Sequence, residues 1–164
     1  MLVVADTSPI NYLVLLEHTA VLPALYTRVF LPPAVMTELQ DPEAPEEVRA
    51  WVADLPAWCE VRRPGPLAEA ETLAHLGAGE REAILLAHEL RADFLLIDEE
   101  DGRQAARSRA LTVTGTLGVL ERAAERGLLD LPSTLARLLT TTFRVRDELI
   151  QTILARDAAR KRPI

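Results

Sequence analysis

Residues 2–9 read Leu-Val-Val-Ala-Asp-Thr-Ser-Pro, and this stretch gives the clearest indication of architecture. Four apolar residues in a row, 2–5, are typical of a short strand that is buried on both faces of a parallel sheet. Asp6 follows directly, and Pro9 stands where a helix can begin. The stretch therefore predicts a buried strand that passes through an acid into a helix, as in α/β proteins.

The same alternation of strand and helix continues along the chain. Further strands are expected at residues 28–31, 59–62, 94–97 and 111–113. Helices are expected between them, most clearly over residues 80–91 and also over residues 67–76. This order predicts an α/β fold, a three-layer α/β/α sandwich with a central parallel sheet. We expect one domain over residues 1–164 with a helical tail from about residue 141 to 164.

Composition narrows the class of protein. The net charge of −7 disfavours binding to a phosphate backbone, unless the acids gather where metal cations cancel them. The single cysteine, Cys59, allows no internal disulfide and no cysteine-based metal site. No basic leader precedes the first apolar run, and no apolar stretch approaches the ~20 residues that span a bilayer. These features predict a cytoplasmic protein with no membrane association.

Four acids fall where the expected elements meet. Asp6 and Asp98 each follow a strand directly, Glu80 opens the helix over 80–91, and Glu38 lies on a helix after two prolines. In an open parallel sheet, ligands bind outside the carboxyl ends of the strands. Asp6 and Asp98 are therefore expected in one crevice, which Glu80 and Glu38 can approach from helices.

Clustered carboxylates need a cation or protons to share a small pocket. Mg²⁺ and Mn²⁺ prefer oxygen ligands, and the chemistry that they support is phosphodiester hydrolysis. No serine nucleophile is well placed, and His18, His75 and His88 have no shared spacing. Each acid also has a plain structural interpretation, as a helix cap, a favourable charge in a first helical turn or a solvated surface group.

Three other site classes fit poorly. A phosphoacceptor receiver domain needs a lysine after a late strand, but the one lysine is Lys161, in the tail. A haloacid-dehalogenase-type phosphatase needs Asp-x-Asp, but residues 6–8 read Asp-Thr-Ser. The pair Gly77 and Gly79 follows a helix-like stretch and lacks the third glycine of a dinucleotide-binding loop.

Four segments in order resemble one protein family. They cover residues 3–10, 29–39, 76–87, and 95–103 together with 113–120, and each of the first four ranges carries one of the four acids. Together they resemble PIN domains, and in particular the VapC-like PIN proteins of the DUF3368 type. The resemblance runs from residue 2 to about residue 140.

The resemblance implies an α/β/α sandwich that acts as a metal-dependent endoribonuclease. It implies that Mg²⁺ or Mn²⁺ is held by Asp6, Glu38, Glu80 and Asp98. The fourth position departs from the commoner pattern, because Glu99, Glu100 and Asp101 crowd beside Asp98, and Asp101 is the second choice. Ser8 would hold a carboxylate or a metal-bound water, and Thr116 would hydrogen-bond into the site or simply begin a helix.

The resemblance also implies partners. These are an RNA substrate, a small antitoxin protein and a second copy of the chain in a homodimer. The leucine- and valine-containing segment 11–16 suits such an interface or the core, and the basic residues of the last segment suit RNA phosphates or a solvated helix face. The rival interpretation is a PIN-fold protein that no longer cuts and serves as an RNA- or protein-binding scaffold.

Overall fold

The structure is a computed structural model that describes residues 1–66 and 70–163. Contacts within the chain divide it into two compact units, Met1–Thr116 and Leu117–Ile164. The expectation of one domain with a tail from about residue 141 stays a prediction.

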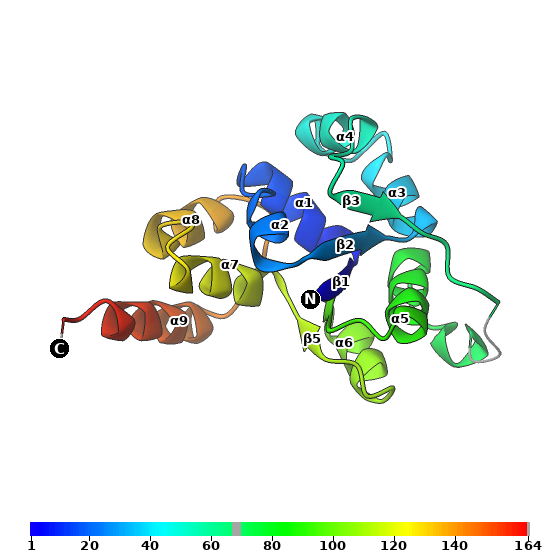
Figure 1. Ribbon diagram of the computed structural model, residues 1–164. Coiled ribbons are helices and arrows are strands. Elements are labelled where there is room, and N and C mark those ends of the chain that lie inside the picture. Colours follow the sequence, from blue (N-terminus) through cyan, green and yellow to red (C-terminus); the bar gives the residue numbers. More distant parts are fainter. Residues whose placement is uncertain (67–69, 164) are drawn as a thin grey trace. The chain divides into compact units, whose positions relative to one another are not determined.

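The first unit is built on a five-stranded, wholly parallel sheet. Its strands are β1 (Leu2–Ala5), β2 (Arg28–Leu31), β3 (Cys59–Val61), β4 (Phe94–Leu96) and β5 (Val113–Thr114). They lie side by side in the order β3-β2-β1-β4-β5 (Figure 1). The predicted α/β class with a central parallel sheet is therefore confirmed.

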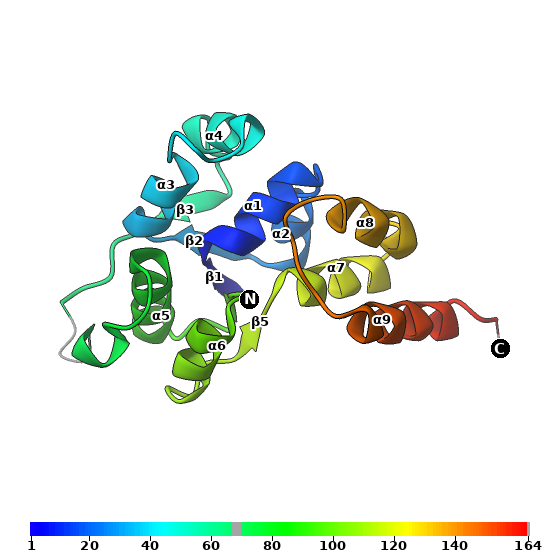
Figure 2. The same ribbon diagram turned by 180° about the vertical axis from the view of Figure 1, so that it is seen from behind.

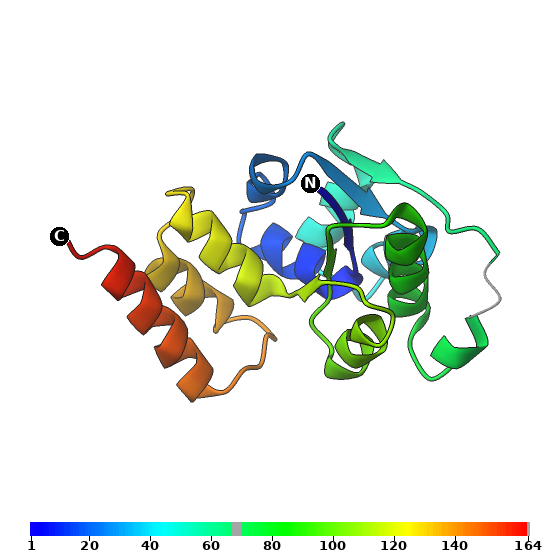
Figure 3. The same ribbon diagram turned by 60° about the horizontal axis from the view of Figure 1, so that its bottom comes forward.

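Helices connect the strands and cover the sheet. They are α1 (Thr7–Leu15), α2 (Val21–Leu25), α3 (Pro33–Leu39), α4 (Glu46–Ala53), the 3₁₀ helix η1 (Ala70–Leu73), α5 (Ala78–Leu90) and α6 (Glu100–Arg107). Figures 1, 2 and 3 agree in placing α1 and α5 on opposite sides of β1. No helix in the described ranges is long and apolar enough to cross a membrane.

The core on one face of the sheet explains why α5 is the best-defined helix of the sequence. Val4, Phe30 and Leu95 project from three strands into a cluster with Ile84 and Leu86 of α5, and all five are at most 1% exposed. The neighbouring strand residues point to the opposite face because side chains alternate along a strand. Burial of both faces accounts for the unbroken apolar runs of β1 and β4, whereas β3, at the edge of the sheet, carries the exposed Glu60.

Two predicted elements differ in the structure. The helix expected over residues 67–76 begins with residues 67–69, which lie outside the described residues, and η1 ends at Leu73. The hydrogen bond from Leu76 N to Leu73 O spans three residues, as in a 3₁₀ turn, and it lets both leucines reach the core. The strand expected at 111–113 lies at Val113–Thr114, because pairing with β4 sets its position.

The sheet order creates a switch point beside β1. From β1 the chain moves to β2 and β3 on one side, and β4 and β5 lie on the other. At such a point the helices leave the sheet on opposite sides, which opens a crevice at the carboxyl ends of the strands. The amide of Asp6 donates to the carbonyl of Leu96 at 2.9 Å, so the ends of β1 and β4 are joined where this crevice begins.

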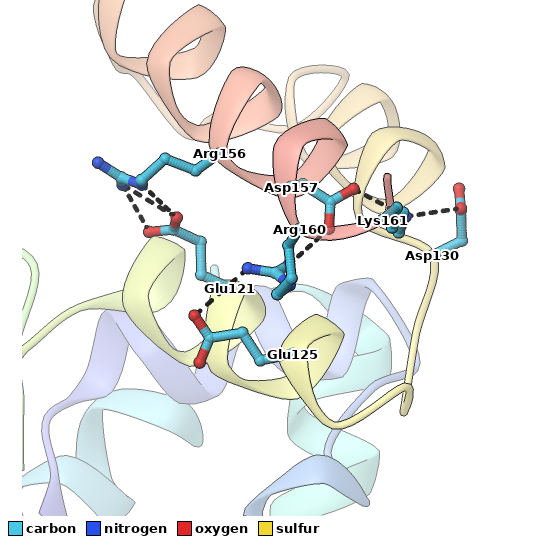
Figure 4. A network of polar contacts seen from close by, with 7 residues as sticks. All are labelled: Glu121, Glu125, Asp130, Arg156, Asp157, Arg160 and Lys161. Carbon is cyan, nitrogen blue, oxygen red and sulfur yellow. Dashed lines mark hydrogen bonds and ion pairs between the residues drawn. The ribbon is translucent and has the colours of Figure 1, made fainter. Parts of the chain in front are cut away.

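The second unit contains most of α7 (Thr116–Glu125), together with α8 (Leu131–Leu138) and α9 (Asp147–Arg160). Asp157 of α9 is 2% exposed, and it pairs with Arg160 at 2.6 Å and with Lys161 at 2.7 Å. Arg156 reaches Glu121 of α7 at 2.9 Å (Figure 4). Much of the positive charge near the C-terminus is thus engaged in ion pairs within its own unit.

We predict that Asp157→Ala lowers the free energy of unfolding of this unit by about 2 kcal/mol. Removing one member of a buried pair leaves charges uncompensated, but Arg160 and Lys161 are partly solvated, which reduces the cost. Urea unfolding of the full chain, followed by circular dichroism, measures the change. Glu125→Ala, which removes one exposed pair, is the control and is expected to change stability by less than about 0.5 kcal/mol. Equal effects of the two variants would contradict this prediction.

Candidate metal centre

Asp6 stands at the centre of the site because it ends β1 and begins α1. Asp6 is only 3% exposed, and its Oδ1 atom has no hydrogen-bond partner. It occupies the N-cap position of α1, but its side chain makes no capping hydrogen bond. Helix capping therefore does not explain this acid. A buried carboxylate oxygen without a donor is costly unless a cation or a proton accompanies it.

Glu38 joins the site from α3. The hydroxyl of Thr7 donates to its Oε2 atom, and the backbone amide of Gly79 donates to its Oε1 atom at 3.0 Å. These donors come from the first turns of α1 and α5, so one carboxylate connects three helices. Its side chain is otherwise exposed, which leaves it open to a ligand.

Glu80 enters from the first turn of α5. Its Oε1 atom accepts a hydrogen bond from the amide of Gly77 at 3.3 Å, which is half of a capping arrangement. Burial raises the pKa of Glu80, the Gly77 amide lowers it, and the charges of Glu99, Glu38 and Asp101 raise it further. The capping role and the site role of Glu80 are thus compatible.

Asp98 follows Ile97 at the end of β4, beside Asp6. The amide and the hydroxyl of Thr116 both donate to its carboxylate at 2.7 Å. Burial raises the pKa of Asp98, whereas the two Thr116 bonds and the charge of Arg103 oppose this rise. Arg103 also donates to the carbonyl of Ile97 at 2.8 Å, so it holds the end of the strand and offsets negative charge there.

The four acids influence one another through their charges. The pKa of Asp6 is raised to about 7, chiefly by burial and further by the charges of Glu80, Glu38 and Asp98, while the Thr7 amide lowers it. Three acids that arrive from separate elements therefore act on one buried carboxyl. This arrangement disfavours full ionisation of the cluster unless a cation is present.

The donor set fits a hard divalent cation, because it consists of carboxylate oxygens and includes one buried oxygen without a partner. Within the ranges that the structure describes, however, no three acids, histidines or cysteines are grouped closely enough to form a complete metal site. Asp6, Glu38, Glu80 and Asp98 are thus neighbours of suitable chemistry, and their role as ligands stays a prediction.

The acids that follow β4 lie in two different parts of the site. The charge of Asp98 raises the pKa of Asp6. Asp101 is exposed, its charge raises the pKa of Glu80, and the two line one cavity of about 350 Å³. Glu99 and Glu100 line the same cavity. The structure therefore places Asp98 beside the buried acid and Asp101 at the outer side of the cluster.

A comparison of sequences agrees with this arrangement. The family DUF3368, described as a PIN domain, matches residues 2–158. The chain belongs to this PIN-domain family. PIN domains are typically nucleases, and they generally use divalent metal ions.

One solved structure resembles this PIN-domain protein at low sequence identity. A solved PilT N-terminus domain protein from the hyperthermophilic archaeon Sulfolobus solfataricus P2 is similar, with 14% identity and a TM-score of 0.48. The similarity covers 89% of this chain and 98% of the other. No curated protein gives a match.

The sequence did not reveal several supporting groups of this PIN domain. It favoured the hydroxyl of Ser8, but the hydroxyl that reaches Glu38 is that of Thr7, and the role of Ser8 stays a prediction. It gave no role to Arg103, although an arginine four residues after an acid at a helix start is a signal of local charge balance. Thr116, which it did select, donates both of its bonds to Asp98.

Three glycines make room for three of the acids. A Cβ atom on Gly79 would lie 2.5 Å from Oε2 of Glu38. One on Gly102 would lie 2.5 Å from Cδ1 of Ile97 and 2.6 Å from Oε2 of Glu80. A Cβ atom on Gly115 would lie 2.6 Å from Oδ1 of Asp98. These separations are too short for van der Waals contact, so a side chain there would displace the carboxylate.

We predict that Gly79→Ala weakens Mn²⁺ binding about tenfold with little loss of stability. The added methyl group meets the far end of the flexible Glu38 side chain, so the carboxylate moves while the helix stays formed. Isothermal titration calorimetry measures the affinity, and thermal unfolding measures the stability. Gly65→Ala is the control, since its Cβ atom lies at an ordinary 3.4 Å from Glu89. Unchanged Mn²⁺ affinity in Gly79→Ala would show that the placement of Glu38 is not needed.

We also predict that the contribution of Asp6 to the stability of the protein in EDTA falls as the pH rises from about 4 to about 7. Asp6 has a higher pKa in the folded chain, about 7, than its ordinary 3.8, so the folded state holds its proton more tightly. This stabilisation is fully present below pH 3.8 and is lost as the pH rises through about 7. The total loss is on the order of 4 kcal/mol.

Asp6→Asn removes this titration. Relative to the wild type, its melting temperature in EDTA is expected to increase as the pH rises from 4 to 8. The exposed variant Asp54→Asn is the control and is expected to show no such trend. A difference between Asp6→Asn and wild type that does not change with pH would contradict the prediction.

Proposed function

We propose that this PIN-domain protein is a Mg²⁺- or Mn²⁺-dependent endoribonuclease that hydrolyses RNA phosphodiester bonds. The observation that carries the proposal is the buried Oδ1 atom of Asp6, which has no hydrogen-bond partner and lies under the influence of three further acids. A carboxylate in that position is a poor structural element and a good ligand for a divalent cation.

In this proposal, Asp6, Glu38, Glu80 and Asp98 hold the metal. When bound, the metal supplies an activated water and neutralises charge on the phosphate oxygens. The chain itself supplies orientation. Thr116 fixes both oxygens of Asp98, and Gly79 directs one oxygen of Glu38.

We further propose that the protein is the toxin of a toxin–antitoxin pair that acts in the cytoplasm. The support is its resemblance to VapC-like PIN proteins, and with it come a small antitoxin as inhibitor and a homodimer as the assembly. The lone thiol, Cys59, is buried and suits a reducing compartment. Burial raises the pKa of Cys59 to about 12, so it is unreactive as a nucleophile.

We predict that the purified protein cleaves a mixed RNA substrate in Mg²⁺ or Mn²⁺, and that EDTA or Asp6→Asn reduces cleavage at least a hundredfold. Gel analysis of end-labelled RNA measures the cleavage. Asp54→Asn, prepared identically, controls for a contaminating nuclease because its exposed acid lies outside the cluster. Cleavage that survives in Asp6→Asn would overturn the proposed function.

The second candidate is a PIN-fold scaffold that binds RNA or protein without cutting. The observation that favours it is that the described residues contain no complete group of three metal ligands. A scaffold of this kind would bind its partner equally well as wild type and as Asp6→Asn, and neither form would take up Mn²⁺ in calorimetry. Uptake of Mn²⁺ by the wild type alone would exclude the scaffold interpretation.

A further inference from the structure

A polar groove lies between η1, α5 and α6, beside the acids but outside the cluster around Asp6. Its volume is about 860 Å³, within the range of ligand pockets. We call it the histidine groove and define it by six of its lining residues: His75, His88, Asp101, Gln104, Ser108 and Arg109. His75 precedes α5 and His88 lies in its last turns, and the fold brings both to one cavity.

Helix geometry builds one wall of the histidine groove. Asp101, Gln104 and Ser108 are three and four residues apart at α6, so they form one stripe along its surface. His88 comes from the last turns of α5, eight residues after Glu80, which corresponds to about 12 Å along the helix. The groove therefore runs from the acids toward the far end of α5.

The histidine groove adjoins the cavity of the acids. His75 and Asp101 line both the groove and the cavity of about 350 Å³ that contains Glu80. A ligand with one part at Glu80 can therefore extend past His75 into the groove. Phosphate and base within one nucleotide form such a ligand.

The two cavities differ in charge. The smaller one is lined by four acids, which suits cations. The histidine groove has one acid, Asp101, and one arginine, Arg109. The rest of its lining consists of imidazole, amide and hydroxyl groups and the methyl group of Ala105. Arg109 donates to the carbonyl of Ala105 at 3.1 Å and to the hydroxyl of Thr72, so it holds the wall together.

These groups suit an uncharged planar ligand with hydrogen-bonding edges. Imidazole rings stack on bases, and amide and hydroxyl groups read the edges of bases that are not paired. A site for a second phosphate would need a surplus of positive charge, which this lining does not have. The chemistry of the histidine groove thus matches a nucleobase better than a phosphate.

We propose that the histidine groove binds one unpaired base of the RNA, next to the phosphate that is cut at the acids. This proposal rests on the proposed ribonuclease function. It makes His88 and Gln104 binding residues for single-stranded RNA. It also gives RNA a polar point of attachment beside an acidic cluster, which by itself would repel the RNA phosphates.

The test is the binding of a fluorescein-labelled, single-stranded RNA hexamer of mixed sequence in Ca²⁺, measured by anisotropy. The double variant His88→Ala/Gln104→Ala is expected to bind about tenfold more weakly, the loss expected for one base stack. Gln151→Ala, an exposed glutamine of α9 that does not line the groove, is the matched control and is expected to bind as the wild type. Duplex RNA of the same sequence is expected to bind more weakly than the single strand.

A second arm locates the base. A single abasic nucleotide is moved through the hexamer, and one position is expected to weaken wild-type binding about tenfold. The double variant is expected to bind this abasic RNA as tightly as it binds the intact hexamer, because the missing base and the missing groove side chains belong to one contact. Additive losses at every position would overturn the proposal, as would equal binding of hexamer by the double variant and Gln151→Ala.

Failure of the groove and failure of the proposed function can be told apart. Hydrolysis of bis(4-nitrophenyl) phosphate by the wild type in Mn²⁺ tests the acidic cluster with a phosphodiester that carries no nucleobase. If the wild type cleaves this diester and RNA while the double variant binds RNA normally, only the groove proposal is wrong. If the wild type cleaves neither substrate, the proposed function is wrong, and the groove proposal falls with it.

Discussion

Burial of Asp6 between the ends of β1 and β4 is the constraint on which the rest of the site depends. The order in which strands are added to the parallel sheet reverses beside β1, and the residue that follows this strand is enclosed although it carries a carboxyl group. Loss of water raises the pKa of Asp6, and its Oδ1 atom finds no donor. A fold that retains such a group gains little from it as a structural element, which is why we assign it a functional one.

The surrounding acids are oriented by backbone and hydroxyl donors, and glycines leave the space that they occupy. Glu38 accepts from the Gly79 amide, and Asp98 accepts from both donors of Thr116. Glycines at 102 and 115 leave space where a Cβ atom would meet a carboxylate. These donors orient the acids without neutralising them, and Arg103 is the cation whose charge acts on Asp98. The cluster therefore keeps negative charge for a ligand to compensate.

The histidine groove complements this charge with neutral polar groups. An acidic site alone repels a polyanion, whereas a metal at the acids and a base in a neutral groove give RNA two points of attachment. In the proposed arrangement, the metal centre holds the phosphate and the histidine groove holds the base. The division follows from the position of Asp101, which faces both cavities from the first turn of α6.

The sequence by itself determined the parallel α/β architecture and the placement of Asp6 and Asp98 at strand ends, since both follow from short unbroken apolar runs that end at an acid. Only the tertiary structure decided that Thr7 contacts Glu38, that Asp101 lies beside Glu80, and that His75 and His88 line one groove. Local patterns depend on residues a few positions apart, whereas these contacts join separate elements. Their formation depends on strand register and helix packing, which no single segment encodes.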